Sequence, residues 1–268
     1  MFPNVSFFGI DLYVMLIMVG IIAAILVLRF CSGEVGMSSK VFNFSLMTIV
    51  VGIVVGYLSA VLFQSWYAFL DTGVWEWGAG ATFYGGLIGG AGCVLLLYFV
   101  VGHFYFKDNS HIAQFNKMIS LAIPCVVLAH AFGRIGCLLD GCCYGAKTDA
   151  WFGIDMYIGG AWEKRVPVQL FEALFLFALF AALMYLLLKR KNGYTASIYL
   201  IAYGVWRFFI EYLRDDARGS SGIDFLSPSQ LTAIIMVVVG VVWFLVCKFL
   251  LDKYFEKVGE KVEKPHQA

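Results

Sequence analysis

Seven long apolar stretches constrain this chain more than any other feature of its sequence. An α-helix that crosses a hydrocarbon layer of about 30 Å needs roughly 20 mostly apolar residues. The stretches lie near residues 7–30, 44–63, 81–102, 118–132, 167–188, 196–213 and 231–251. Each is therefore expected to be a transmembrane helix, and the fourth is the shortest.

The composition agrees with a membrane protein. Of the 268 residues, 61% are hydrophobic and only 14% are charged. Soluble domains average about 45–50% apolar and about 25% charged residues, so a water-soluble globule is excluded. The formal net charge of +1 offers no basic surface for nucleic acid, and no nucleic-acid partner is expected. We predict an all-α integral membrane protein with seven transmembrane helices.

Basic residues in alternate loops predict the orientation. Cytoplasmic loops carry an excess of Lys and Arg. Such residues follow the first, third, fifth and seventh stretches, whereas the loop 64–79 has none. We expect the N-terminus outside and the C-terminus inside. Residues 1–251 would form the membrane domain, with an extracytoplasmic insert at about 133–166, and residues 252–268 a charged cytoplasmic tail. The first stretch lacks a basic leader and is expected to be a retained helix.

The sixth stretch contains the main set of charged residues. Charges inside a membrane are costly and usually functional. Tyr203, Arg207 and Glu211 are spaced four apart, with Arg214 three residues later, so one helix side carries all of them. The pattern fits an ion pair that joins helices. It also fits an anionic lipid headgroup, because two arginines exceed one carboxylate and a guanidinium matches phosphate oxygens.

Two further polar sets lie at the ends of other stretches. Arg165, Gln169 and Glu172 share the spacing of a helix side at the start of the fifth stretch, where Arg165 is expected to extend toward the membrane surface. The run from Ala129 to Gly145 places Arg134 among three glycines, namely Gly133, Gly136 and Gly141. We expect these glycines to break the helix, either as an anion-binding turn around Arg134 or as a plain re-entrant turn.

Seven cysteines are present, and three of them cluster. Cys137, Cys142 and Cys143 follow Arg134, whereas the others lie in or beside apolar stretches and are expected to pack as small hydrophobes. The cluster is compatible with simple packing, a disulfide, a soft metal ion or a reactive thiolate. In the third stretch GGLIGGAG, which follows Tyr84, has the spacing of close helix packing.

These residues together resemble the bacterial prolipoprotein diacylglyceryl transferases. The matching blocks run in order along nearly the whole chain, and the block in the sixth stretch is the most specific. They are Tyr13, FYGGLIG from Phe83, GRIG from Gly133, RVPVQLFE from Arg165, YGVWRFFIEYLR from Tyr203 and SPSQ from Ser227.

The resemblance implies a reaction and a site. Such enzymes of the bacterial inner membrane move a diacylglyceryl group from phosphatidylglycerol to the thiol of a lipobox cysteine in a secreted prolipoprotein, and glycerol phosphate is released. No cofactor or metal ion is implied. Arg134, Arg207 and Glu211 would be catalytic, with Arg214 as a further phosphate ligand. The remaining residues expected to contact the substrate are Tyr13, Gly133, Gly136, Gln169 and Tyr203.

The chain departs from the family pattern where protons are handled. Tyr84 stands where the family typically has a histidine proposed as the base, and Cys142 stands where it has a glutamate. A tyrosine with an ordinary pKa of about 10 is a poor base near neutral pH, so Asp140 or Cys142 is an alternative. Three other functions stay open: a phosphatidylglycerol-dependent transferase with another acceptor, a membrane thiol oxidoreductase that uses the cysteine cluster, and a transporter.

Overall fold

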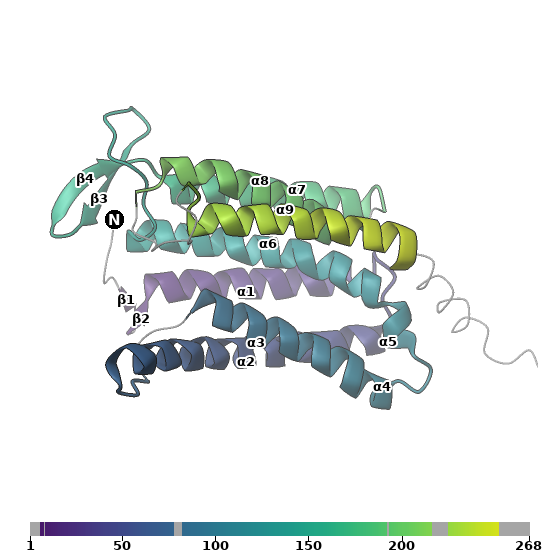
Figure 1. The fold of residues 1–268 in the computed structure, drawn as a ribbon. Coiled ribbons are helices and arrows are strands. Elements are labelled where there is room, and N and C mark those ends of the chain that lie inside the picture. The colour runs from purple at the N-terminus through teal and green to yellow at the C-terminus, as the bar shows by residue number, and fades with distance from the viewer. Residues whose placement is uncertain (1–5, 8, 78–81, 192, 216–224, 252–268) are drawn as a thin grey trace, which may run out of the picture. The chain divides into compact units, whose positions relative to one another are not determined.

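The computed structural model describes residues 6–7, 9–77, 82–191, 193–215 and 225–251 (Figure 1). The tail predicted at 252–268 lies outside the described residues. The helices are α1 (Leu12–Cys31), α2 (Ser39–Thr72), α3 (Phe83–Leu96), the π-helical η1 (Leu97–Val101), α4 (Gly102–Tyr105), α5 (Ser110–Ala113), α6 (Phe115–Asp140), α7 (Val168–Leu188), α8 (Thr195–Ile210), the 3₁₀ turn η2 (Glu211–Leu213), α9 (Pro228–Val246) and the π-helical η3 (Cys247–Leu251). Two antiparallel hairpins pair β1 (Ser6–Phe7) with β2 (Ile10–Asp11) and β3 (Ile154–Ile158) with β4 (Ala161–Arg165).

Six helices in the described part of the chain are long and apolar enough to cross a membrane. They are α1, α2, the combined helix Gly85–Tyr105, α6, α7 and the helix Pro228–Phe249. The sixth predicted stretch forms α8, which has 16 residues before η2 continues it to Leu213. The prediction of an all-α membrane protein therefore holds at the level of fold class.

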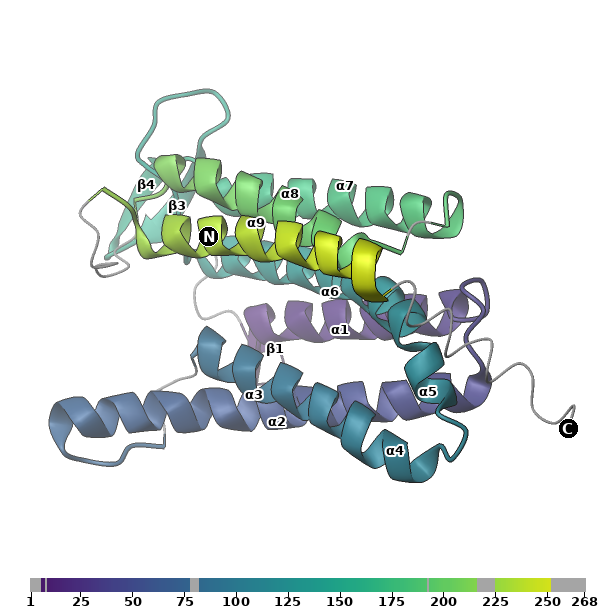
Figure 2. The same cartoon turned by 45° about the vertical axis from the view of Figure 1, so that its right-hand side comes forward.

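The described residues divide into two compact units, one formed by those up to residue 35 and those from 119 to 251, and the other by those between 36 and 118. In the first unit, α6, α7 and α8 share an apolar core. Val127, Leu176 and Leu183 are fully buried there, and Tyr203 of α8 packs against them. Helix α8 also packs closely on α9, and both figures show the two helices side by side (Figure 2). A Cβ added at Gly204 would lie 2.9 Å from the carbonyl oxygen of Ala233.

Helix α9 begins at the SPSQ motif for a local reason. The Ser227 side chain accepts a hydrogen bond from the backbone of Gln230, and the Gln230 side chain accepts one from the backbone of Ser227. This reciprocal capping box satisfies two amide groups at the helix start, and Pro228 occupies the first turn, where no amide donor is needed. The motif therefore fixes where the helix starts, beside the charged end of α8.

In the second unit, α2 and α3 pack through glycines, as the GGLIGGAG spacing predicted. A Cβ at Gly56 would lie 3.0 Å from the Gly86 carbonyl oxygen and 3.2 Å from the Gly90 Cα. Only the absence of side chains allows backbones to approach this closely. Helix α2 is longer than expected: it continues through part of the predicted loop 64–79 and ends at Thr72, where the following Gly73 closes the helix in the left-handed conformation with a φ of 73°.

The helix break expected at Gly133 and Gly136 is wrong. Helix α6 continues through both residues to Asp140 and has 26 residues, so the fourth stretch is not short. A glycine inside a helix costs only about 1 kcal/mol relative to alanine, whereas each backbone group left unbonded in a membrane costs several kcal/mol. The first left-handed glycine of the run is Gly141, with φ of 80°. Arg134 therefore projects from a continuous helix.

Candidate active site

A buried carboxylate, Glu172 on α7, joins three helices of the first unit. Its Oε1 lies 3.0 Å from Nε of Arg134 on α6 and accepts a hydrogen bond of 2.6 Å from the hydroxyl of Tyr203 on α8. The Glu172 side chain is fully buried, and that of Arg134 is 16% exposed. Breaking a buried ion pair costs about 3–5 kcal/mol, so each helix fixes the position of the others here. We call Arg134, Glu172 and Tyr203 the Glu172 network.

A second network surrounds Glu211 at the end of α8. The Arg207 Nη2 lies 2.9 Å from Glu211 Oε2, which is the ion pair that the spacing of four predicted. Arg214 Nε lies 3.8 Å from the same oxygen, and Ser227 donates a 2.9 Å hydrogen bond to Glu211 Oε1. Arg207 also donates to the Ser229 hydroxyl at 2.9 Å. We call these five residues the Glu211 network.

The two networks interact and bring three guanidinium groups together. The Glu172 carboxylate interacts electrostatically with Arg207 as well as with Arg134. The described side chains of these networks include three guanidinium groups and two carboxylates. Among the described residues, the buried Nη1 of Arg207 has no hydrogen-bond partner. A buried donor without an acceptor is costly, so this nitrogen is suited to an oxygen of a bound anion.

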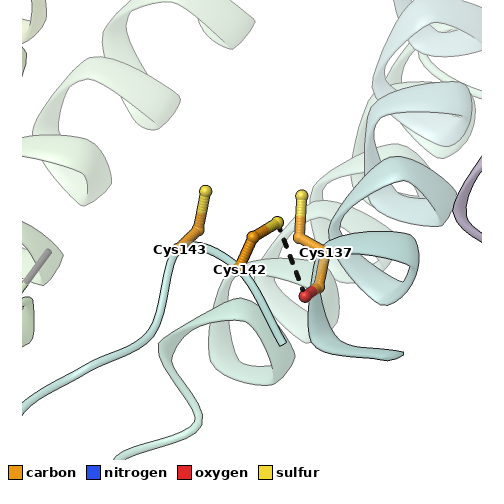
Figure 3. Close-up of side chains that lie close together, drawn as sticks. All are labelled: Cys137, Cys142 and Cys143. Atoms are coloured by element: carbon orange, nitrogen blue, oxygen red, sulfur yellow. Dashed lines mark hydrogen bonds between the residues drawn. The ribbon is translucent and has the colours of Figure 1, made fainter. Parts of the chain in front are cut away.

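The three clustered cysteines lie at the end of α6, beside these networks. Figure 3 shows their sulfur atoms on the same side of the turn, and all three lie within 4.8 Å of one another. Gln169 of α7 donates a 2.6 Å hydrogen bond to the Cys142 carbonyl and holds the turn against α7. Cys143 adopts a φ of 59°, which turns the chain back after Gly141.

The thiols of Cys142 and Cys143 have pKa values shifted in opposite directions. Hydrogen bonds from Cys137 and Cys142 lower the pKa of the Cys143 thiol, and the Arg214 guanidinium lowers it further. Hydrogen bonds with Cys137 and Cys143, together with burial, raise the pKa of Cys142. Cys143 is therefore the first thiol of the cluster to ionise, and Arg214 connects the cluster to the Glu211 network.

The segment after the cysteines passes between two other backbone segments. The Gly145 amide donates to the Val166 carbonyl at 3.1 Å, and the next amide donates to the Leu213 carbonyl at 2.9 Å. A Cβ at Gly145 would lie 2.5 Å from that Val166 oxygen, so only glycine fits. This crossing holds the start of α7 and the end of α8 at fixed positions relative to the cysteine turn.

Arg165 does not lie on the helix side that its spacing suggested. It ends strand β4, whereas α7 begins at Val168. Its guanidinium pairs with Glu163 and with Asp215, each at 2.6 Å, and stacks over the Tyr144 ring. The expectation that Arg165 continues the helix side of Gln169 and Glu172 is therefore wrong, because Pro167 and the hairpin end separate it from the helix.

The structure brings most of the predicted site residues together. Arg134, Tyr203, Arg207, Glu211 and Arg214 belong to the two networks, and Gln169 and Cys142 lie beside them. Tyr13 of α1 packs its ring against Gly136, where a Cβ would lie 2.9 Å from the ring. A Cβ at Gly133 would meet nothing within 4 Å.

Two predicted residues do not join this group. Asp140 is exposed at the last position of α6 and makes none of the ion pairs seen among the described residues. Tyr84 lies in α3, in the other unit, and its side chain is not described.

Sequence reasoning left Glu172 out of the candidate site, although it is central to the network. The signal was present, because a carboxylate lay one turn inside an apolar stretch. Ser227 and Ser229 were recognised only as part of a motif, and no pattern linked them to the charges of α8.

These features define a class: a multi-helix membrane protein with a buried, positively charged polar site at one end of α6, α7 and α8. The family model for prolipoprotein diacylglyceryl transferase matches residues 2–246. A phosphatidylglycerol–prolipoprotein diacylglyceryl transferase 2 of Clostridium perfringens is 33% identical over 263 residues, which cover 95% of this chain and 97% of the relative.

Other relatives agree with this result. The phosphatidylglycerol–prolipoprotein diacylglyceryl transferase of Clostridium tetani is 33% identical, with 90% of this chain and 96% of the relative covered. That of Streptococcus uberis is 30% identical, with 89% and 91% covered. The chain belongs to the prolipoprotein diacylglyceryl transferase family.

Proposed function

We propose that this chain transfers the sn-1,2-diacylglyceryl group of phosphatidylglycerol to the thiol of a lipobox cysteine in a secreted prolipoprotein. The observation that carries the proposal is the convergence of three guanidinium groups where α6, α7 and α8 meet in a member of this family, with the buried Nη1 of Arg207 lacking a hydrogen-bond partner among the described residues. An anionic phosphodiester is the ligand that such a site favours, since guanidinium groups are always charged and donate in pairs.

Arg134, Arg207 and Arg214 act on the phosphate. When the acceptor sulfur attacks the glyceryl carbon, a C–S bond forms, the C–O bond to phosphate breaks, and the electron pair leaves with glycerol phosphate. Negative charge therefore grows on the phosphate oxygens in the transition state. Preorganised donors such as the Arg207 Nη1 stabilise that charge more than they stabilise the substrate, which lowers the barrier.

The other residues position these arginines or the lipid. Glu211 holds Arg207 through their ion pair, and Tyr203 orients Glu172, which in turn holds Arg134. Tyr13, Gly133, Gly136 and Gln169 line the lipid side of the site in our proposal. Tyr84, Asp140 and Cys142 are the candidates for taking the proton of the acceptor thiol.

We also propose how the chain is oriented across the membrane. Helix α8 with η2 counts as the seventh span, because the two together extend from Thr195 to Leu213. The basic loops support an outside N-terminus, an inside C-terminus and a site on the extracytoplasmic side of the bacterial inner membrane. Cysteine-accessibility labelling in intact cells, with single cysteines placed in each loop, tests this arrangement.

The activity is tested with purified protein in vesicles that contain phosphatidylglycerol. A lipobox peptide should gain the mass of a diacylglyceryl group while glycerol phosphate is released in equal amount. Arg207→Ala should lower kcat/KM by about 10²–10³-fold, by analogy with the loss of one oxyanion donor. Arg190→Ala is the matched control, since Arg190 is exposed and contacts the Tyr185 ring instead of the site.

Expression in cells depleted of their own transferase tests the acceptor. Growth and lipoprotein modification should recover, and a failure of both would favour the transferase with another acceptor. The comparisons do not favour the thiol oxidoreductase or the transporter, since every relative described here carries a transferase name.

A further inference from the structure

The cysteine cluster is the strongest chemical feature that the phosphate-binding networks do not use. Cys137 comes from the last turn of α6, and Cys142 and Cys143 come from the turn that follows it. Two left-handed residues, Gly141 and Cys143, fold the turn back so that the three sulfur atoms lie within 4.8 Å of one another (Figure 3).

Three converging thiols are a donor set for a soft divalent cation. Zinc binds thiolates at about 2.3 Å with tetrahedral geometry, which separates neighbouring sulfur atoms by about 3.8 Å. The observed separations of up to 4.8 Å require movements of only about 1 Å, since Cys142 and Cys143 lie in a turn and only Cys137 lies in a helix. Three protein ligands leave the fourth tetrahedral position open, as in catalytic zinc sites.

The surrounding charge favours such an ion. Three thiolates around Zn²⁺ carry one net negative charge, and the neighbouring networks contain the guanidinium groups of Arg134, Arg207 and Arg214. Arg214 interacts with Cys143 directly and belongs to the Glu211 network. The thiolate site and the guanidinium groups therefore compensate each other, and the site also lies beside the proposed phosphate position.

We propose that Cys137, Cys142 and Cys143 bind one zinc-type metal ion whose fourth position receives the acceptor thiol. This inference rests on the proposed function. With Cys142 as a metal ligand, no protein base is needed: the acceptor R–SH loses its proton to water when its sulfur binds the ion, because a metal-bound thiol is deprotonated. The bound thiolate then attacks the glyceryl carbon, the C–O bond breaks, and glycerol phosphate leaves with the electron pair. The thioether product is neutral and dissociates from the metal.

The metal site is tested first, without any assay of transfer. Protein purified from cells grown with added Zn²⁺ should contain about one zinc ion per chain by elemental analysis. Cys142→Ser and Cys143→Ser should each lower that content by about tenfold or more. Cys31→Ser is the matched control and should keep the full content, since Cys31 lies at the C-terminal end of α1 and outside the cluster.

Cobalt gives a second measurement that depends on the ligands. Co²⁺ bound by three thiolates should show sulfur-to-metal charge transfer and the visible bands of a tetrahedral ion, and Cys142→Ser should abolish both. Counting thiols in unfolded, metal-free protein separates the alternatives. Seven reactive thiols are expected, and five would show that a disulfide has formed. A disulfide, or reduced protein with only background metal, overturns the proposal.

The role of the fourth position has its own test. A lipobox peptide with its cysteine should change the cobalt spectrum, whereas the same peptide with serine should leave it unchanged. A cobalt site that does not respond to the cysteine peptide overturns thiol activation. A peptide that binds the metal but is never lipidated in phosphatidylglycerol vesicles contradicts the proposed function instead, so the two failures are distinguishable.

Discussion

The Glu172 network allows a stability prediction worked from the structure. Glu172→Gln keeps an oxygen that accepts the Tyr203 hydroxyl but removes the charge opposite Arg134, at 3.0 Å. Removing one partner of a buried ion pair costs about 3–5 kcal/mol. Because the Arg134 side chain keeps 16% exposure, we expect the lower end, about 3 kcal/mol. At roughly 2–4 °C per kcal/mol, Tm falls by about 6–12 °C.

Thermal unfolding in detergent, followed by tryptophan fluorescence and by the monomer fraction after heating, measures this shift. Glu34→Gln is the control, because Glu34 is exposed in the turn that follows α1. The Tm of this variant should equal that of the wild type. The double variant Arg134→Gln/Glu172→Gln replaces the ion pair with two neutral amides. It should recover most of the lost stability, since a buried charge without a partner is what costs energy.

Two results would refute this reasoning. One is a Tm for Glu172→Gln within about 2 °C of the wild type, well below the shift that the buried pair requires. The other is a double variant no more stable than the single one, which would mean that the unpaired Arg134 charge is not the cause. Activity provides a separate readout: the double variant should stay inactive even where its stability recovers, because Arg134 is then absent from the phosphate site.

Three other perturbations have defined outcomes. Gly145→Ala should prevent stable folding, because the added Cβ would lie 2.5 Å from the Val166 carbonyl oxygen. The measurement is the yield of monomer in detergent, and Gly33→Ala, which has open space around its Cβ, should give the normal yield. Ser227→Ala removes the cap of α9 and a hydrogen bond to Glu211, and should cost about 1–2 kcal/mol of stability together with a lower kcat; an unchanged Tm would contradict this. Two hydrogen bonds lower the pKa of the Glu163 carboxyl, the stronger effect coming from Lys147 and the next from Arg165. The contribution of Glu163 to the β3–β4 hairpin is therefore complete above the ordinary carboxyl pKa of about 4.3 and is lost as the pH falls below it. Amide exchange in residues 161–166 should rise between about pH 5 and pH 3, and Glu163→Gln should remove that pH dependence.

The fold class and many residues of the candidate site could be predicted from the sequence. Helix length in a membrane is fixed by the thickness of the hydrocarbon layer, so apolar runs predict spans without tertiary information. The Arg207–Glu211 ion pair follows from a spacing of four on one helix, and the contact between α2 and α3 follows from glycine spacing. Intramembrane charge is costly, so charged residues in apolar stretches indicated where a candidate site is to be expected.

What the sequence could not determine were contacts between segments far apart in the chain. Glu172 contacts Arg134 and Tyr203 only because α6, α7 and α8 pack together. Residue spacing within one helix cannot predict a contact between different helices. The continuity of α6 through two glycines was also misjudged, because local propensity is weaker than the need to bond every backbone group in a membrane. The sequence by itself determined which helices form and which residues are polar within them. The three thiols lie together because the turn after α6 folds back at Gly141 and Cys143, a local backbone conformation that only the structure revealed. Only the tertiary structure decided which charges of different helices pair and which nitrogen of Arg207 has no hydrogen-bond partner among the described residues, since these depend on how separate helices pack.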